Sequence, residues 1–254
     1  MSRSLFLFGD QHDNFGETSR PFIEAAGGGT AKIAVLTAGG PKAQPYVARI
    51  TAPWQQMGVE VVTIGPEEYA GEPDEGMAQA IRQCDGIFMC GGETRHLQRI
   101  YVASALGDLI RDMYSAGVPF AGVSAGALLA AEQCAAWGGI VTTPTNEYYV
   151  RYRGCYEELD GDKTAIQLEL DKGLGLVHDC VFEPHFSEMG GFPRLVTVMQ
   201  WTGVTHGYGL DEPICLVIED GRPTRVLGQG RLYHLERTVS DRFELTVYEP
   251  GAEF

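Results

Sequence analysis

The sequence is poor in positive charge: 19 Lys and Arg stand against 34 Asp and Glu, for a formal net charge of -15. Nucleic acid and anionic membrane surfaces repel so acidic a chain, so we expect neither as a partner. No apolar run approaches the roughly 18 residues that a membrane helix needs. The apolar start ends at Asp10, too early for a signal peptide, which predicts a cytoplasmic protein.

The sequence also lacks any Cys-x-x-Cys pair, which argues against a zinc ribbon and a thioredoxin-like motif. Most of its cysteines have apolar neighbours, as in Ile214-Cys215-Leu216, which is typical of reduced core thiols in a cytosolic protein. The six are Cys84, Cys90, Cys134, Cys155, Cys180 and Cys215.

Short apolar segments alternate with longer amphipathic ones through the first half of the chain. Nearly continuous apolar strands separated by helices predict a doubly wound, mostly parallel α/β sheet. We expect strands at Leu5–Phe8, Lys32–Thr37, Val59–Ile64, Gly86–Cys90 and Pro119–Val123. The expected helices are Glu17–Ala26, Ala43–Met57, Met77–Arg82, Leu97–Ala116 with a break near Gly107, and Ala125–Ala135.

The second half has a different pattern. Residues 138–172 are polar and contain four tyrosines, which indicates a long loop or insertion. Strand–helix order resumes at Cys180–Phe186 and Pro193–Trp201, and residues 214–248 form a β-rich C-terminal segment. No linker or repeat interrupts the chain, so we expect a single domain over residues 1–254.

The strongest motif is Gly122-Val123-Ser124-Ala125-Gly126, placed between a predicted strand and a predicted helix. A serine at such a sharp turn projects its hydroxyl above the sheet, as a nucleophile must. The alternative is a glycine-rich packing turn. Gly91-Gly92 ends the neighbouring predicted strand, so the N–H groups of Gly92 and Ala125 are candidates for an oxyanion hole.

A serine nucleophile needs a base and an acid that orients the base. His185 follows an apolar strand, which predicts that it lies on the same sheet edge as Ser124, and His178 is its competitor. The residues leave three candidates for the acid: Glu132 after the elbow, Glu147 in the polar region, and Glu183, expected on the same strand face as His185.

Four motifs together resemble peptidase family S51, which includes aspartyl dipeptidases and cyanophycinases. They are the Ser124 elbow, Cys90-Gly91-Gly92-Glu93-Thr94, Glu183-Pro184-His185-Phe186, and the segment from Gly207-Tyr208-Gly209-Leu210-Asp211-Glu212 to the Gly228-Gln229-Gly230 hairpin. The resemblance covers nearly the whole chain. It implies a fold like that of class I glutamine amidotransferases, with serine in place of their cysteine.

The resemblance also implies roles for individual residues. Ser124 would be the nucleophile, His185 the base, and the N–H groups of Gly92 and Ala125 the oxyanion donors. It favours Glu147 as the acid. It requires no cofactor and no metal, and it allows a homodimer.

Departures from the cyanophycinase pattern suggest a different substrate. Thr94 and Pro184 favour dipeptidase-like members that cut after an N-terminal aspartate, with a small peptide as the partner. Arg194 would hold the aspartate carboxylate in a bidentate contact, or would form a structural ion pair. We place Thr94, Arg194 and Glu183 in the substrate site.

Other functions remain open on the sequence. They are a cyanophycinase-like β-aspartyl peptidase, another esterase or amidase, and an inactive relative that binds a peptide or amino acid. The cluster Asp10-Gln11-His12-Asp13 could suggest a metal, but its spacing matches no closed ligand set, so we expect a polar loop.

Overall fold

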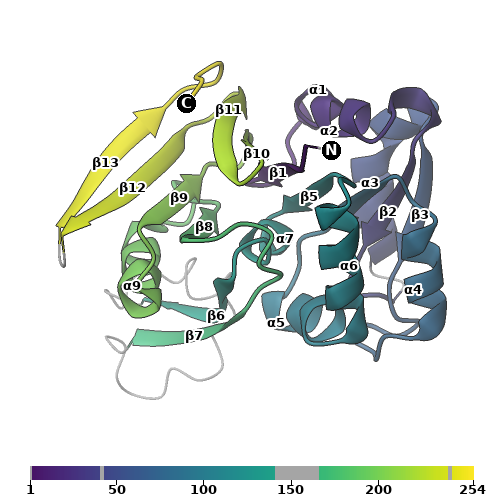
Figure 1. The fold of residues 1–254 in the computed structure, drawn as a ribbon, viewed down its shortest axis with the longest axis horizontal. Coiled ribbons are helices and arrows are strands. Elements are labelled where there is room, and N and C mark those ends of the chain that lie inside the picture. The colour runs from purple at the N-terminus through teal and green to yellow at the C-terminus, as the bar shows by residue number, and fades with distance from the viewer. Residues whose placement is uncertain (1, 41–42, 141–165, 240–241) are drawn as a thin grey trace.

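A seven-stranded sheet forms the centre of the computed structural model, which describes residues 2–40, 43–140, 166–239 and 242–254 (Figure 1). The strand order is β11-β10-β1-β5-β4-β2-β3, and β1, β5, β4, β2 and β3 run parallel to one another. This confirms the predicted fold class. Their bounds are β1 Ser4–Phe8, β2 Lys32–Leu36, β3 Glu60–Ile64, β4 Gly86–Met89, β5 Phe120–Val123, β10 Ile214–Glu219 and β11 Arg222–Gly228.

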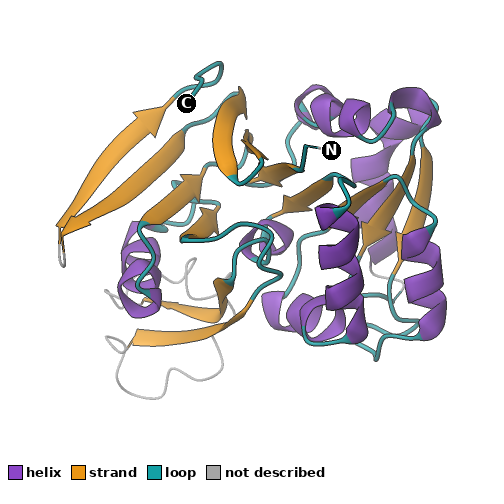
Figure 2. Cartoon of the chain, viewed as in Figure 1, coloured by secondary structure: helices purple, strands orange, loops and turns teal. Residues whose placement is uncertain are grey.

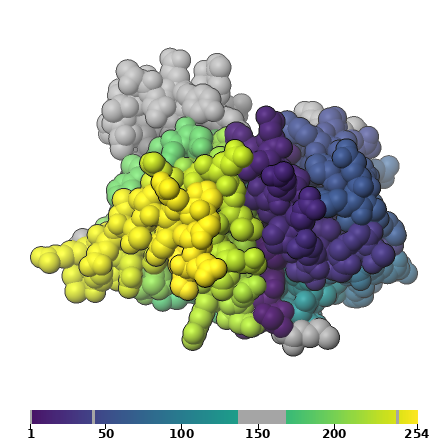
Figure 3. Space-filling model, turned by 90° about the horizontal axis from the view of Figure 1, so that it is seen from above, coloured from purple at the N-terminus to yellow at the C-terminus, as the bar shows by residue number. Residues whose placement is uncertain are grey.

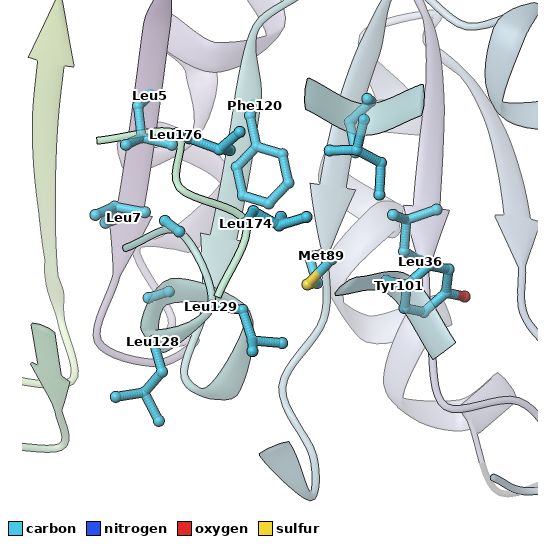
Figure 4. Packing of buried hydrophobic residues seen from close by; sticks show 14 of the residues in the cluster. Leu5, Leu7, Leu36, Met89, Tyr101, Phe120, Leu128, Leu129, Leu174 and Leu176 are labelled. Atoms are coloured by element: carbon cyan, nitrogen blue, oxygen red, sulfur yellow. The ribbon is translucent and has the colours of Figure 1, made fainter. Parts of the chain in front are cut away.

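Apolar side chains cover both faces of this sheet. In β1, Leu5 and Leu7 belong to one buried cluster and Phe6 and Phe8 to another, because successive side chains of a strand point to opposite faces. Figure 4 shows the first cluster from close by, with Leu5, Leu7 and Phe120 among its labelled residues. Burial on both faces explains why these strands are apolar without alternation.

Helices on the two faces complete the doubly wound arrangement. Helix α4 (Glu75–Arg82) and helix α6 (Ala105–Ser115) contribute to the first cluster. Helices α1 (Phe15–Thr18), α2 (Arg20–Ala25) and α3 (Ala43–Gln56) contribute to the second. None of the helices in the described ranges is long and apolar enough to cross a membrane.

Two predicted helices are divided differently from expectation. The predicted helix Glu17–Ala26 corresponds to α1 and α2, which meet at Ser19. The predicted break near Gly107 lies earlier: α5 (Thr94–Leu97) and a π-helical turn η2 (Gln98–Val102) precede α6. Ser104 caps α6, since its hydroxyl accepts a hydrogen bond from the Leu106 N–H at 3.2 Å.

The prediction of a helix over Ala125–Ala135 is wrong beyond its first turn. Helix α7 ends at Leu128, and Gln133–Ile140 forms β6, paired with β7 (Ile166–Lys172). The Leu129 and Ala130 carbonyls accept hydrogen bonds from Leu174 and Leu176 N–H groups at 2.7 and 2.9 Å. Tertiary contacts thus override the helix propensity of this alanine-rich segment. The ends of the predicted 138–172 loop are therefore strands, and residues 141–165 lie outside the described ranges.

A second sheet, of order β13-β12-β9-β8, lies beside the first (Figure 2). Its strands are β8 Cys180–Pro184, β9 His206–Leu210, β12 Leu232–Val239 and β13 Arg242–Tyr248, and α9 (Phe192–Thr202) packs on it. The sequence pattern predicts the C-terminal strands but not a separate sheet containing β8. Viewed from above, the purple N-terminal segment borders the green and yellow C-terminal residues (Figure 3), in agreement with the β1–β10 pairing.

Five cysteines lie in the described ranges, and all five are free and buried. Burial raises the pKa of Cys84 to about 11 and that of Cys134 to about 12, so little thiolate exists at neutral pH. We therefore expect a Cys155→Ser variant to show almost no reaction with Ellman's reagent until it is unfolded in guanidinium. Rapid reaction of one native thiol or more would contradict this burial.

Candidate active site

The Ser124 turn has the strained geometry of a nucleophile elbow. Ser124 has φ 55° and ψ -116°, an unfavourable conformation for a side chain with a Cβ. The residues two positions before and after it must be glycine: a Cβ on Gly122 would lie 2.4 Å from the Gly126 carbonyl oxygen, and one on Gly126 only 2.2 Å from that of Met89. The close packing of β5, β4 and α7 therefore explains both glycines of the motif.

The Gly91-Gly92 loop lies beside the elbow, as the sequence predicts. Strands β4 and β5 are in register, with Met89 opposite Gly122, so their carboxyl ends are adjacent. Gly92 has φ 142°, a conformation that favours glycine. Ala125 is the first residue of α7, and its N–H has no acceptor within that helix. Both N–H groups remain candidates for oxyanion binding.

His185 contacts Ser124, although it comes from the other sheet. The distance from Ser124 Oγ to His185 Nε2 is 2.8 Å, and the histidine is only 4% exposed. The expectation that both residues lie on one sheet edge is wrong, because β8 pairs with β9 and not with the central sheet. The contact joins the residue after β5 (Phe120–Val123) to the residue after β8 (Cys180–Pro184).

Glu212 is the carboxylate at the far side of the histidine ring. Its Oε1 lies 2.9 Å from His185 Nδ1, and its side chain is 23% exposed. A neutral His185 that donates from Nδ1 to Glu212 leaves Nε2 as the acceptor for the Ser124 hydroxyl. Ser124, His185 and Glu212 therefore have the connectivity of a Ser-His-acid triad.

The environment favours the ionised form of Glu212. Burial opposes ionisation, but hydrogen bonds from His185 and His12 outweigh it and lower the pKa of the Glu212 carboxyl. Glu212 is the second residue after β9, in the Asp211-Glu212 pair of the C-terminal motif. Its neighbour Asp211 instead accepts hydrogen bonds from the backbone N–H groups of Ser187 and Arg231, so Glu212 is the member of this pair that contacts the histidine.

The acids proposed from the sequence have other positions. Glu132 pairs with His178, the competing base, at 2.9 Å; both are largely exposed, and neither partners Ser124 or His185 in the described contacts. Glu147 lies outside the described residues. The signal that points to Glu212 is the Asp-Glu pair at the end of an apolar strand, which sequence reasoning noted only as part of the family motif.

Glu183 and Arg194, which the sequence analysis placed in the substrate site, form a buried ion pair. Their side chains are 1% and 2% exposed, and Arg194 Nη2 also donates to the Ala135 carbonyl at 3.1 Å. Strand β8 ends at Pro184, and the positive φ of His185 (54°) breaks the alternation that would place both side chains on one face. Glu183 therefore points toward α9, whereas His185 points toward Ser124.

Thr94, the third expected substrate residue, begins α5 just after the Gly91-Gly92 loop and is half-buried. This loop packs closely against Ser124 at Gly91, because a Cβ there would lie 3.0 Å from both Ser124 Cβ and Tyr46 Oη. Thr94 therefore stays a candidate for substrate contact, at the end of a loop that passes close to Ser124.

A metal ion could use some of the same atoms. Single donor atoms of Asp10, His185 and Glu212 lie within 4.8 Å of one another, and carboxylate and imidazole are both common ligands of divalent cations. A cation on His185 Nδ1 would, however, replace the proton that the histidine shares with Glu212. The hydrogen-bonded chain from Ser124 to Glu212 accounts for two of these side chains, His185 and Glu212, without an ion.

Comparison with known proteins identifies the family of this chain. The model of the family described as Peptidase family S51 matches residues 6–226, which include the elbow, His185 and Glu212. The chain belongs to peptidase family S51. It is accordingly a serine hydrolase of the peptidase class, and the resemblance seen in its motifs is confirmed.

Several relatives of this S51 chain are cyanophycinases. The protein of that name from Trichormus variabilis is 25% identical over 232 residues, which cover 91% of this chain and 70% of the relative. The one from Geminocystis herdmanii is 23% identical over 217 residues, covering 84% and 72%. These identities support the family while leaving the substrate of this chain open.

Two solved structures share the fold. A peptidase from an acI-B1 Actinobacterium superposes with a TM-score of 0.69 at 17% identity, covering 99% of this chain and 96% of its own. A protein of Listeria monocytogenes EGD-e, provisionally described as peptidase E, gives a TM-score of 0.60 at 18% identity, with 91% and 100% covered. The α/β architecture of this S51 chain is thus that of known peptidase structures.

Proposed function

We propose that this protein hydrolyses small peptides, namely dipeptides with an N-terminal aspartate, through a Ser124–His185–Glu212 triad and an acyl-enzyme. The observation that carries the proposal is the pair of hydrogen-bond distances at His185: 2.8 Å to Ser124 and 2.9 Å to Glu212. A base held between a hydroxyl and a carboxylate can activate that hydroxyl for attack on a carbonyl.

In the proposed reaction, Ser124 Oγ attacks the scissile carbonyl carbon while His185 Nε2 takes the hydroxyl proton. Glu212 stabilises the imidazolium that forms. The N–H groups of Gly92 and Ala125 donate to the oxyanion, and His185 then gives its proton to the leaving amine. A water molecule, deprotonated by the same histidine, then attacks the ester carbonyl, and His185 returns this proton to Ser124 Oγ as the acyl C–O bond breaks.

The aspartate preference rests on Thr94 and on Pro184, the positions that resemble dipeptidase members. Arg194 no longer supports it, because this guanidinium is buried against Glu183. The similarity to cyanophycinases supports a second candidate, cleavage of β-aspartyl peptides. A cytoplasmic location is also proposed, supported by the free, buried cysteines of the described ranges.

The test is amino-acid release from a panel of α-aspartyl, β-aspartyl and neutral dipeptides by the wild type and Ser124→Ala. We expect release from α-aspartyl dipeptides by the wild type and a loss of about 10⁶-fold in the variant, as in other serine hydrolases that lose the nucleophile. Release from β-Asp-Arg alone would favour the second candidate.

A fluorophosphonate probe tests whether Ser124 is an activated nucleophile without depending on which peptide the protein cleaves. We expect it to label the wild type at Ser124 and to leave Ser124→Ala unlabelled. Labelling without release from any peptide would reject the dipeptidase proposal but keep the serine hydrolase. Equal peptide cleavage by both proteins would reject Ser124 as the nucleophile.

A further inference from the structure

His12 binds the oxygen of Glu212 that faces away from His185. The distance from His12 Nε2 to Glu212 Oε2 is 3.1 Å, while Glu212 Oε1 lies 2.9 Å from His185 Nδ1. An ionised carboxylate only accepts hydrogen bonds, so His12 must be the donor. Four side chains thus form one continuous chain from the nucleophile to the surface: Ser124, His185, Glu212 and His12.

A second carboxylate competes for the same histidine nitrogen. Asp10 Oδ2 lies 4.0 Å from His185 Nδ1, too far for a hydrogen bond but close enough to take the place of Glu212 after a small movement. Asp10 and Glu212 also carry like charges, and oxygen atoms of the two carboxylates lie within 4.8 Å of each other, so they repel. A donor on the outer oxygen of Glu212 offsets this repulsion and keeps Glu212 in contact with the ring.

The backbone holds His12 and Glu212 side by side. The Gly9 N–H donates to the Ile214 carbonyl at 3.0 Å, and the Asp10 N–H donates to the Glu212 carbonyl at 2.8 Å. The His12 carbonyl accepts from the Phe15 N–H at 2.9 Å in the turn before α1. Phe15 is 5% exposed and packs on Phe8, so the turn that carries His12 is anchored in the core.

From this arrangement we infer that His12 is a positioning residue for the proposed hydrolysis: it orients Glu212 toward His185 and stabilises the charge of the carboxylate. The inference rests on the proposed triad. A solvent-facing ion pair alone contributes little, and the His12 side chain is 46% exposed. The pair of His12 and Glu212 is not of this kind, because Glu212 is only 23% exposed and its other carboxylate oxygen contacts His185, the proposed base.

The experiment compares His12→Leu, which removes the donor, with His12→Gln, which retains an N–H donor. His178→Leu is the matched control, since His178 forms a similar 2.9 Å contact with Glu132 but touches no residue of the triad in the described structure. The readouts are the rate of fluorophosphonate labelling at Ser124, kcat and KM on the best-cleaved dipeptide, and the downfield proton resonance of the His185–Glu212 hydrogen bond, assigned by its loss in Glu212→Gln.

We expect His12→Leu to lower the labelling rate and kcat about tenfold and to leave KM unchanged. A hydrogen bond to a charged group contributes about this factor. The downfield resonance should broaden or shift. His12→Gln should recover most of the rate, and His178→Leu should match the wild type.

Equal labelling rates for His12→Leu and the wild type would overturn the inference. So would a loss in His12→Leu that His12→Gln fails to recover while the downfield resonance stays unchanged, since that result indicates a structural role. Failure of the triad itself is distinguishable, because Ser124→Ala would then still be labelled or Glu212→Gln would keep full activity.

Discussion

Replacing Glu212 by glutamine is expected to lower kcat/KM by about 10³- to 10⁴-fold, with the fold unchanged. The glutamine keeps the size of the side chain but has no charge to stabilise the imidazolium, and its amide can favour the wrong histidine tautomer. Its effect should fall mainly on kcat, because Glu212 Oε1 contacts the Nδ1 side of His185, away from Ser124. Steady-state kinetics on the best dipeptide measures it.

The matched controls are Glu132→Gln and Glu147→Gln, the two other acids that the sequence offers. Glu132 pairs with His178 at the surface, so its substitution should change kcat/KM by less than about twofold. If Glu147→Gln were as damaging as expected for Glu212→Gln, and Glu212→Gln were mild, the acid would be Glu147 and the 2.9 Å contact at His185 Nδ1 would not be the catalytic one.

Replacing Arg194 by methionine should lower the free energy of unfolding by about 3–5 kcal/mol, because the substitution leaves the Glu183 carboxylate charged and buried without its guanidinium. Both side chains are at most 2% exposed, and the pair joins β8 to α9 two residues before His185. Urea unfolding followed by circular dichroism gives the value. Glu183→Gln should also lower the free energy of unfolding, because it leaves the buried Arg194 guanidinium without its carboxylate.

The double variant Arg194→Met with Glu183→Leu should be closer to the wild type than either single variant, since it leaves no unpaired charge. Arg111→Ala is the control, because its pair with Asp108 is exposed and should contribute less than about 1 kcal/mol. A stable Arg194→Met protein with a raised KM for aspartyl peptides would instead restore Arg194 as a substrate ligand.

Local sequence rules were sufficient to predict the strained turn at Ser124 and the glycine loop beside it. Gly122 and Gly126 are needed because a Cβ at either position would collide with the backbone, and this requirement is visible in the motif itself. The neighbouring Gly91-Gly92 loop follows from the adjacency of parallel strands β4 and β5. Apolar runs likewise predicted the parallel sheet, since strands buried on both faces have no polar alternation.

Contacts between distant segments decided the rest. The sequence by itself determined the α/β class, and it predicted Ser124 as the candidate nucleophile and His185 as the candidate base. The tertiary structure decided that Glu212 meets His185, because the pairing of β8 with β9 and the hydrogen bonds between residues 9–10 and 212–214 place it there. It also decided that Glu183 points away from the site, because one residue with positive φ, His185, ends the alternation of β8. Neither outcome is encoded in a local pattern, since each depends on which segments pack together.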